Sequence, residues 1–427
     1  MAYNNFFVTK NKLILKSKNK HITLIGINFY PEDTAIGLYS TQLAEYLINK
    51  GYDVSVITGF PYYPQWKIAE NYRNKPRYYT EKHKGIEIFR YKQYVPENPG
   101  FLKRIIHLLD FTFGSYFNLK KIKHTDLVFA VVPFTSDVWL GKKLAQKHKA
   151  KLWIHIQDFE FDAAIEAKLS GGNGFLFKIL FKIESYLFNQ ANMASSISYA
   201  MIKKLKTKIR PGKNTYLLPN WVDPNAINPQ KARQHPYLSS EKFKVLYSGN
   251  IGQKQDWDLF VQVTGAFQDN PDIKFVVVGA GAYKETLKKR LEEYPHVSMY
   301  DPVPFEELSD LLCSADLHVL FQKNDVIDTV MPSKILGMMA SEKPSVMAGN
   351  KASEVAQVIK DSKGGFYFDN QDKNLIINQI KDLMKNKEKA VETGKNARKY
   401  IIEHFSSDKI LADFEKQITQ LLQITTD

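Results

Sequence analysis

The sequence has only one cysteine, Cys313, among its 427 residues. A lone cysteine excludes an internal disulfide and a cysteine-based metal site, and it suits a protein kept in a reducing compartment. No apolar run reaches the ~20 residues that a membrane-spanning helix needs, and residues 1–20 lack the apolar core of a signal peptide. We therefore expect a cytoplasmic protein that does not span a membrane.

Acidic residues are scarce in the first half of the chain. Residues 1–20 contain five lysines and no acid, and residues 1–225 contain 33 Lys and Arg against 17 Asp and Glu, whereas residues 226–427 contain 26 against 28. The net charge of +14 therefore belongs to the first half. Such a surface attracts nucleic acid, anionic lipid or an anionic substrate. Composition alone does not distinguish these three partners. It also does not exclude a basic surface that has no partner and only keeps the protein soluble.

The sequence does contain ample material for a folded core. Its 44% hydrophobic and 24% charged residues are typical of globular proteins, and the chain is too long for a single hydrophobic core. It has neither a repeat of solenoid length nor a low-complexity tract. We therefore look for two or three ordinary domains.

Residues 243–260 predict a strand, a loop and the start of a helix. The loop contains Gly249, Gly252 and Lys254, and helical spacing of apolar residues begins at Trp257. Glycines let the backbone approach an anion, the first amides of a helix point toward it, and a lysine adds positive charge. This pattern indicates the phosphate-binding unit of a doubly wound α/β domain.

A similar unit opens near His21. An apolar strand over 22–30 leads to a loop around Gly37 and then to an amphipathic helix that ends at Gly51. We therefore predict two Rossmann-like α/β domains that face each other across a cleft, with a ligand between them. The predicted divisions are a basic extension over 1–20, a first domain over 21–217, a linker over 218–242, a second domain over 243–403 and a last helix over 404–427.

A second anion site is predicted in the second domain. Residues 322–333 form a loop after a strand, Ser333 caps the helix that follows, and Lys334 adds charge beside the first amides of that helix. Two such sites on separate loops favour a bound diphosphate over helix capping alone. The turn Gly279-Ala280-Gly281 is only weak evidence for a nucleotide.

Titratable residues follow the strand predicted over 151–156. His155, Asp158, Glu160 and Asp162 lie where a parallel strand delivers its residues into the cleft, so they are the catalytic candidates of the first domain. The alternative is that His155 is a core histidine and that the acids cap the next helix.

Two stretches of the first half predict contact with an acceptor or a membrane. Tyr62, Tyr63 and Trp66 form an aromatic loop, and aromatic faces stack on sugar rings, although plain loop packing explains them equally well. Residues 101–123 mix apolar residues with lysine and arginine. This mixture suits a helix that lies on anionic lipid, and equally a surface helix that covers a sheet.

The chain resembles the GT-B glycosyltransferases, specifically the large retaining family 4, over nearly its whole length. The likeness is closest to the branch for colanic-acid and O-antigen (exopolysaccharide) biosynthesis. It rests on NFYPEDTAIGLYSTQLAEYL (28–47), PYYPQWKI (61–68), HIQDFEFDAA (155–164), LPNWVD (218–223), YSGNIGQKQ (247–255) and MPSKILGMMASEKPSV (331–346). The resemblance implies a UDP- or GDP-linked sugar donor held mainly by the second domain, an acceptor held mainly by the first, and a last helix that crosses back to the first domain.

Carried over by position, the resemblance places Gly37 under the donor phosphates and the acceptor hydroxyl. Asn250 and Lys254 stand where the family has Arg and Lys, so one of two positive charges remains. Thr329 and Gly337 stand where the family has a pair of glutamates in the donor domain.

Two further departures concern phosphate binding and catalysis. The segment Pro332-Ser333-Lys334 is expected to compensate for the missing glutamates by binding phosphate, while ribose contacts come from elsewhere. The family's His-Asp pair corresponds to Gln157-Asp158, and His155 is displaced from it by two positions.

The resemblance thus gives a set of expected site residues. Donor binding is expected at Gly37, Gly249, Asn250, Gly252, Lys254, Gln255, Gly279, Pro304, Pro332, Ser333, Lys334 and Ile335, catalysis at Asp158, His155 and Lys254, and acceptor binding at Tyr62, Tyr63 and Trp66. Positive groups would stabilise the departing diphosphate, and Asp158 would orient or deprotonate the acceptor hydroxyl. Neither a metal nor another cofactor is expected. Asp256-x-Asp258 resembles a metal-binding DxD motif, but we interpret it as a helix start.

The predicted function is a sugar transferase that builds a polyprenyl-diphosphate-linked saccharide for cell-surface polysaccharide or O-antigen. Its basic first domain would suit an anionic membrane, with the protein peripheral on the inner face of the bacterial plasma membrane. One alternative is a nucleotide-sugar-processing enzyme of the same fold, such as an epimerase, although no pair of acids flanking a sugar is evident. Another is an inactive family member that acts by binding. The lack of a nucleic-acid-binding motif argues against a nucleic-acid partner.

Overall fold

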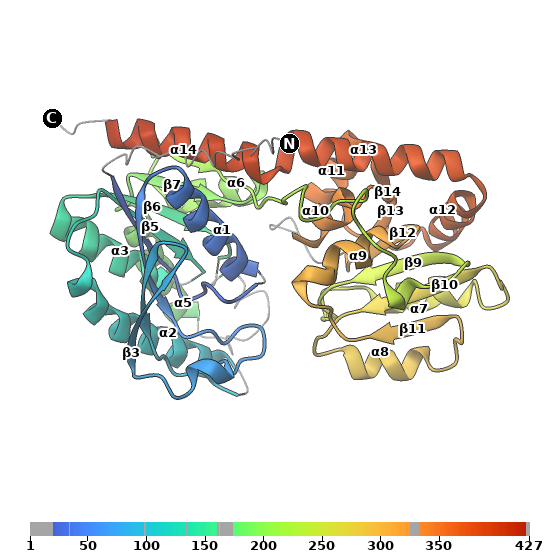
Figure 1. Ribbon diagram of the computed structural model, residues 1–427, viewed down its shortest axis with the longest axis horizontal. Helices are drawn as coiled ribbons and strands as arrows, with labels where there is room; N and C mark the ends of the chain where they lie inside the picture. Colours follow the sequence, from blue (N-terminus) through green and yellow to red (C-terminus); the bar gives the residue numbers. More distant parts are fainter. Residues whose placement is uncertain are drawn as a thin grey trace, which may run out of the picture. The chain divides into compact units, whose positions relative to one another are not determined.

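The structure is a computed structural model, and it describes residues 20–33, 35–97, 100–133, 135–159, 162, 174–324 and 333–423 (Figure 1). Within these ranges, the side chains of residues 101, 174–177 and 333 are not described. Contacts divide the chain into two compact units. The first contains Met1–Ile154, Phe159–Asn192 and Leu421–Asp427, and the second contains His155–Asp158 and Met193–Gln420.

The first unit alternates strands and helices, as its apolar runs and amphipathic stretches require. Its elements are β1 (His21–Ile25), α1 (Ala35–Asn49), β2 (Asp53–Gly59), η1 (Glu70–Tyr72), β3 (Tyr78–His83), β4 (Ile86–Tyr91), α2 (Phe101–Tyr116), η2 (Phe117–Lys121), β5 (Leu127–Val132), α3 (Thr135–His148), β6 (Lys151–Ile156) and α5 (Gly174–Phe188). β1 is parallel to both of its neighbours, with Ile22 beside Val54 of β2 and Leu127 of β5. All six residues of β5 are buried, as expected for a parallel sheet that is covered on both faces.

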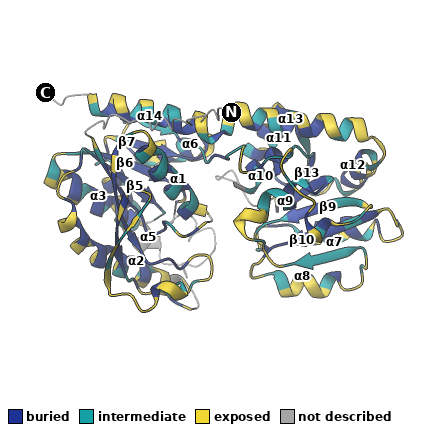
Figure 2. Cartoon of the chain, in the orientation of Figure 1, coloured by how far each residue is buried: buried dark blue, intermediate teal, exposed yellow. Residues whose placement is uncertain are grey.

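The second unit follows the same alternation. Its elements are β7 (Met193–Ser196), α6 (Tyr199–Lys208), β8 (Thr215–Leu217), η3 (Pro236–Leu238), β9 (Phe243–Ser248), α7 (Trp257–Gly265), β10 (Ile273–Val278), α8 (Lys284–Leu291), β11 (Val297–Tyr300), η4 (Phe305–Glu307), α9 (Leu308–Cys313), β12 (Leu317–Phe321), α10 (Ser333–Ala340), β13 (Ser345–Ala348), α11 (Glu354–Ser362), β14 (Gly365–Phe368), α12 (Lys373–Lys385), α13 (Lys387–Phe405) and α14 (Ser407–Gln423). Buried residues concentrate in β9, β10, β12 and β13, which form the core of this unit (Figure 2).

The strands form two sheets, in the orders β3-β4-β2-β1-β5-β6-β7-β8 and β11-β10-β9-β12-β13-β14. The predicted α/β class with parallel sheets is confirmed. In the second sheet, Phe243 of β9 lies beside Ile273 of β10, and Val245 lies beside Leu317 of β12. The chain therefore runs outward from β9 to β11 and returns to β12 on the other side of β9. The loops after β9 and β12 leave the same edge at this switch point, where doubly wound sheets bind ligands.

The division into units differs from the boundary predicted at 218–242. Residues 155–158 and the segment from Met193 group with the second unit, although they were predicted in the first domain. Hydrogen bonds explain this grouping, because Gln157 Nε2 donates to Asn220 Oδ1 at 3.1 Å and Val222 N donates to Phe405 O at 3.0 Å. The facing of two domains and the crossing of the last helix stay predictions. Within the described ranges, no helix is both long and apolar enough to cross a membrane.

Candidate functional site

The loop after β9 is held against the loop after β10. Gly249 N donates to Val278 O at 2.9 Å, and Ile251 N donates to Ala280 O at 2.8 Å. Gly249 has a φ of 140°, which favours glycine. A Cβ added to Gly279 would lie 2.0 Å from Gly249 O. Gly279 is therefore required for the close packing of the two loops, which explains this glycine without a nucleotide.

Lys334 lies in the first turn of α10, beside the loop after β9. Its Nζ donates to Tyr247 Oη at 3.1 Å and lies 4.9 Å from the centre of the Tyr247 ring, within the range of a cation–π contact. A Cβ added to Gly249 would lie 3.1 Å from the same nitrogen. Tyr247 Oη in turn donates to Asn250 O at 2.6 Å. Three of the predicted donor-binding residues, Lys334, Gly249 and Asn250, thus lie together.

The electrostatics of this group favour an anion. Burial raises the pKa of the Tyr247 hydroxyl well above its usual range, so this phenol is neutral and does not cancel the charge of Lys334. The first amides of α10 add partial positive charge at the same end of the helix. A phosphate group suits such a combination of an ammonium, helix amides and a glycine that lets the backbone approach.

Lys254 has an exposed side chain in the loop after β9. Its backbone O accepts a hydrogen bond from Lys323 N at 3.1 Å, and an antiparallel bridge joins Gln255 to Gln322. These contacts fix the loop to the residues that follow β12, across the switch point. Gln255 Oε1 also accepts a hydrogen bond from Gly252 N at 3.2 Å. Both of these predicted donor-binding residues therefore shape the loop itself.

The two aspartates after this loop have structural partners. Asp256 is the N-cap of α7, where its side chain accepts a hydrogen bond from Leu259 N at 3.0 Å, and its second oxygen accepts one from Asn370 Nδ2 at 2.5 Å. Asp258 forms an ion pair with Arg290 at 2.7 Å. The interpretation of this acidic pair as a helix start is confirmed.

The remaining predicted donor-binding residues of the second unit differ in exposure. The side chain of Ile335 is fully buried in the core, so only its backbone is able to meet a ligand. Pro304 is exposed, immediately before η4. Ser333 is the first residue of α10, and Pro332 lies outside the described residues.

Gly337, which stands in place of one family glutamate, faces the core. A Cβ at this position would lie 3.2 Å from Leu312 Cδ1 and 3.4 Å from Ile227 Cδ1. A carboxylate side chain would therefore start against apolar groups, where burying its charge is costly. Thr329, at the position of the other glutamate, lies outside the described residues.

His155 is buried within a chain of polar side chains. Its Nδ1 lies 2.9 Å from Ser195 Oγ, its Nε2 lies 2.9 Å from Gln157 Nε2, and Gln157 Nε2 also donates to Asn220 Oδ1. An amide nitrogen is only a donor, so His155 Nε2 accepts and Nδ1 carries the proton. Burial lowers the pKa of His155 to about 3. The ring is thus neutral at physiological pH, which favours the alternative of a core histidine over a proton-transfer role.

Asp158 lies two residues beyond β6 and its side chain is exposed. It is therefore accessible to a ligand, unlike His155, and its catalytic role stays a prediction. Glu160 lies outside the described residues, while Asp162 is partly buried.

Glu32, which no sequence pattern marked, joins the loop after β1 to the aromatic loop. Its Oε1 accepts hydrogen bonds from Tyr62 N at 2.8 Å and Tyr63 N at 2.9 Å, and its Oε2 accepts one from Asn28 Nδ2 at 2.8 Å. Glu32 is 6% exposed. Burial raises the pKa of its carboxyl, although these hydrogen bonds and the charge of Arg90 act in the opposite direction. Glu32 is thus a positioning residue for the predicted acceptor loop.

The aromatic residues of this loop differ in exposure. Tyr62 is 4% exposed and packs edge-on against Trp66 and His107, with ring centroids 5.4 and 4.9 Å away. Tyr63 is 37% exposed, and Trp66 is partly buried. The packing alternative therefore suits Tyr62, and Trp66 also packs, with the Arg104 guanidinium 5.2 Å from its ring centre. Contact of Tyr63 and Trp66 with an acceptor stays a prediction.

Gly37 lies in the first turn of α1 and packs against Glu32. A Cβ added to Gly37 would lie 2.7 Å from Glu32 Cβ and 3.0 Å from Glu32 Oε2. This contact explains the glycine without a ligand. Its position under the donor phosphates stays a prediction.

Alanine in place of Glu32 is expected to lower the free energy of unfolding by about 3 kcal/mol, because it leaves buried donors without an acceptor. Glu32→Gln is expected to cost less, about 1–2 kcal/mol, because a glutamine oxygen still accepts from the two tyrosine amides, whereas its amide nitrogen no longer accepts from Asn28 Nδ2. Urea unfolding at neutral pH measures both values. Equal losses for the two variants would contradict this account of the carboxylate.

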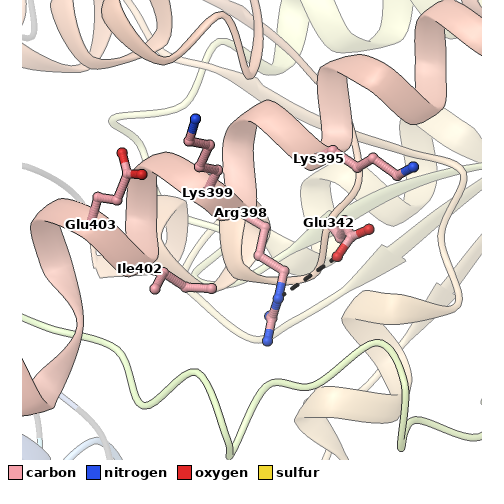
Figure 3. Close-up of a pocket in the computed structure, with 6 residues that line it drawn as sticks. All are labelled: Glu342, Lys395, Arg398, Lys399, Ile402 and Glu403. Carbon is pink, nitrogen blue, oxygen red and sulfur yellow. Dashed lines mark ion pairs between the residues drawn. The ribbon is translucent and has the colours of Figure 1, made fainter.

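A separate depression of about 330 Å³ lies on α13, away from these residues (Figure 3). It is lined by Glu342, Lys395, Arg398, Lys399, Ile402 and Glu403, none of which is a predicted site residue. Arg398 is largely committed to structure, since it donates to Ile227 O at 2.9 Å, to Pro224 O at 3.0 Å and to Ala340 O. Its Nε also lies 3.7 Å from the Glu342 carboxylate. We assign this depression no ligand.

Known proteins resemble the chain in sequence. A family model described as Glycosyl transferases group 1 matches residues 229–400. Over 360 residues, the chain is 31% identical to a protein of Escherichia coli (strain K12) named as a colanic acid biosynthesis glycosyl transferase, WcaI. That match covers 80% of this chain and 86% of the relative.

Solved structures share the fold. Sucrose-phosphate synthase from Thermosynechococcus elongatus matches with a TM-score of 0.72 at 15% identity, covering 95% of this chain and 100% of that one. HepE of Anabaena, solved in complex with UDP-glucose, matches with a TM-score of 0.64 at 14% identity, covering 94% and 99%. At 14–15% identity, these solved structures show only that the fold is shared. The Escherichia coli protein, at 31% identity, matches most of its own length and most of this chain. The chain therefore belongs to the group 1 glycosyl transferases, which have the GT-B fold.

Proposed function

We propose that this glycosyltransferase moves a hexosyl group from a UDP- or GDP-linked sugar to a polyprenyl-diphosphate-linked saccharide, in the synthesis of exopolysaccharide or O-antigen. The name of the Escherichia coli relative supports the class of product, and the HepE complex with UDP-glucose supports a nucleotide-sugar donor. One observation carries the donor assignment. The ammonium of Lys334 lies beside Gly249, at the switch point of the second sheet.

In the proposed reaction, the bond between the anomeric carbon and the diphosphate oxygen breaks, and the acceptor oxygen forms a new bond to that carbon. Negative charge grows on the departing diphosphate, so Lys334, Lys254 and the first amides of α10 stabilise the transition state. Asp158 orients the acceptor hydroxyl or takes its proton. His155, neutral and buried, holds Gln157 in place. Retention of configuration and independence from metal are part of the proposal and rest on the family resemblance.

The acceptor side of the proposal places the enzyme on the inner face of the plasma membrane. A lipid-linked acceptor is confined to a membrane, and residues 1–225 carry a net charge of +16 while residues 226–427 carry −2. Anionic lipids attract such a surface. Of the acceptor-loop residues, Tyr63 is exposed enough to stack on a sugar ring.

The second candidate is a family member that binds a nucleotide-sugar without transferring it. The observation that favours it is the packing of Gly337, where the carboxylate that the family has at this position would start 3.2 Å from the apolar Leu312 Cδ1. An epimerase of the same fold is less well supported, because the described residues around Lys334 supply a cation and no pair of acids.

A thermal-shift series with UDP, GDP, ADP and their common sugars tests the donor assignment. We expect one nucleotide to raise the melting temperature, because a ligand that binds only the native state adds about 2.7 kcal/mol at a hundred-fold excess over its Kd. The shift should be the same with and without magnesium. Transfer activity with the same donor then separates the enzyme from the binding protein.

Lys334→Ala is the matched control for this series. It should lose most of the nucleotide-induced shift while its melting temperature without ligand stays close to that of the parent protein. A full set of nucleotides without any shift would refute the donor site, and an unchanged shift in Lys334→Ala would refute the role given to this lysine.

A further inference from the structure

We infer that the first unit carries a membrane-contact face, formed by α2, α3 and α5 and suited to an anionic bilayer. We name it the α2–α3–α5 face. The inference rests on the proposed function, because a lipid-linked acceptor requires an enzyme that reaches a membrane. It goes further in assigning the contact to particular helices.

α2 is apolar on two opposite sides. Leu108 and Phe111 are buried where α2 packs against β2 and β4. The outer side of the helix carries an exposed stripe of Leu102, Ile106, Leu109, Phe113 and Tyr116, spaced alternately four and three residues apart. Leu102 is 71% exposed and Phe113 is 62% exposed. A helix that only covers a sheet has polar residues on its outer side, so this stripe marks a surface for contact.

α3 and α5 extend the stripe sideways. Trp139 of α3 stacks on Tyr116 with ring centroids 5.5 Å apart. Lys142, one turn further along α3, donates to Tyr186 Oη of α5 at 2.9 Å. α5 presents its own stripe, in which Ile183 is 47% exposed and Tyr186 is 57% exposed. The exposed apolar residues of α2 and α5 are therefore linked through Trp139 and Lys142 of α3 within the first unit.

The exposed charges on this face have one sign. They are the cations Lys103, Lys120, Lys143, Lys178 and Lys182. Within the described residues of α2, η2, α3 and α5, the acids are Asp110, Asp137 and Glu184. Asp137 and Glu184 are buried, and the Asp110 carboxylate accepts hydrogen bonds from Tyr91 Oη and Tyr94 N. Among these residues, the apolar stripe is thus flanked by lysines without an exposed acid.

This combination fits an anionic bilayer better than the other partners. Apolar side chains enter the acyl boundary while lysines meet the headgroup phosphates. A second copy of the chain, placed face to face, would bring the same cations against each other. Nucleic acid would use the lysines but leave exposed side chains such as Leu102 and Ile106 without a role. The occupant we assign is therefore the anionic surface of a membrane.

Sedimentation of the full-length protein with vesicles tests the inference. The protein should bind vesicles of phosphatidylethanolamine and phosphatidylglycerol, and bind phosphatidylcholine vesicles much less. Ile106→Ser combined with Phe113→Ser should weaken partition at least about tenfold, because two inserted side chains are lost. Leu375→Ser combined with Val391→Ser is the matched control, since these residues of the second unit are 54% and 55% exposed. The control should bind as the parent does.

The outcomes separate the two proposals. Equal binding by both double variants, or no binding by the parent protein, would overturn the membrane face. The membrane face would also be overturned if the parent protein is a dimer in solution and the double variant Ile106→Ser, Phe113→Ser is a monomer. The nucleotide-induced thermal shift is measured on the same preparations. A retained shift with lost vesicle binding leaves the donor site standing, whereas vesicle binding without any shift supports the face and counts against the proposed transferase.

Discussion

Alanine in place of Lys334 is expected to lower kcat/KM about 100-fold, with losses both in kcat and in affinity for the donor. Removing one preorganised group that stabilises a developing charge costs on this order, and the same ammonium is expected to hold the diphosphate of the bound donor. The fold should survive, because Lys334 is half-buried and Tyr247, which it contacts, keeps its own hydrogen bond to Asn250 O. Lys254→Ala is also expected to impair transfer strongly.

Steady-state transfer with the donor identified by thermal shift measures these effects. Lys289→Ala is the matched control, since Lys289 is an exposed lysine of α8 in the same unit, and it should keep full activity. Equal thermal unfolding of all variants would show that the fold is intact. Retained activity in both Lys334→Ala and Lys254→Ala would remove the diphosphate assignment.

The second large effect concerns acid. Burial lowers the pKa of both His155 and His318 to about 3 from a usual 6.5. Between these values the unfolded chain binds two protons that the folded chain does not. The free energy of unfolding should therefore fall by about 3 kcal/mol for each unit of acidification below pH ~6. The contribution is complete above pH ~6.5 and is lost as the pH falls toward ~3.

Urea unfolding across this pH range gives the slope. Burial raises the pKa of Glu32 and Glu354, so these acids oppose the histidines in part, and variants are needed to isolate one group. His318→Asn should remove about half of the histidine contribution to the pH dependence of the free energy of unfolding. His404→Asn, at an exposed position, should leave this pH dependence unchanged. If His318→Asn does not fold, NMR of the parent protein replaces it. Titration of the His155 or His318 ring near pH 6.5 in the folded state would contradict the prediction.

The parts of the fold that could be predicted are the strands buried on both faces. The strand predicted over 151–156 is β6, which begins and ends at those residues and is almost wholly buried, because short apolar runs between polar residues are typical of parallel strands. β3 was missed because its residues YYTEKH alternate between exposed and half-buried positions at the antiparallel edge of the sheet. β14 was also missed, and its four residues are half-buried. The short helices α6 and α11 also escaped notice.

At the site, the proximity of Lys334 to the loop after β9 could be predicted in outline, since adjacent strands deliver their loops to one edge. The neutrality of His155 could not, because it depends on burial and on Ser195, 40 residues further along the chain. Glu32 was missed for the same reason, since its partners in the aromatic loop lie 30 and 31 residues away. The local sequence shows which residues are polar, but their pKa values depend on burial and on partners that are distant in the sequence.

The helix α10 is fastened at both of its ends. Lys334 in its first turn donates to Tyr247 of β9, and Ala340 O in its last turn accepts a hydrogen bond from Arg398 of α13. Because this eight-residue helix is hydrogen-bonded at both ends, it fixes the distance between α13 and the end of β9. In the proposed donor site, an arriving diphosphate would therefore meet a lysine whose rotamers are already restricted, and less conformational entropy would be lost on binding than with a lysine on an unrestrained loop.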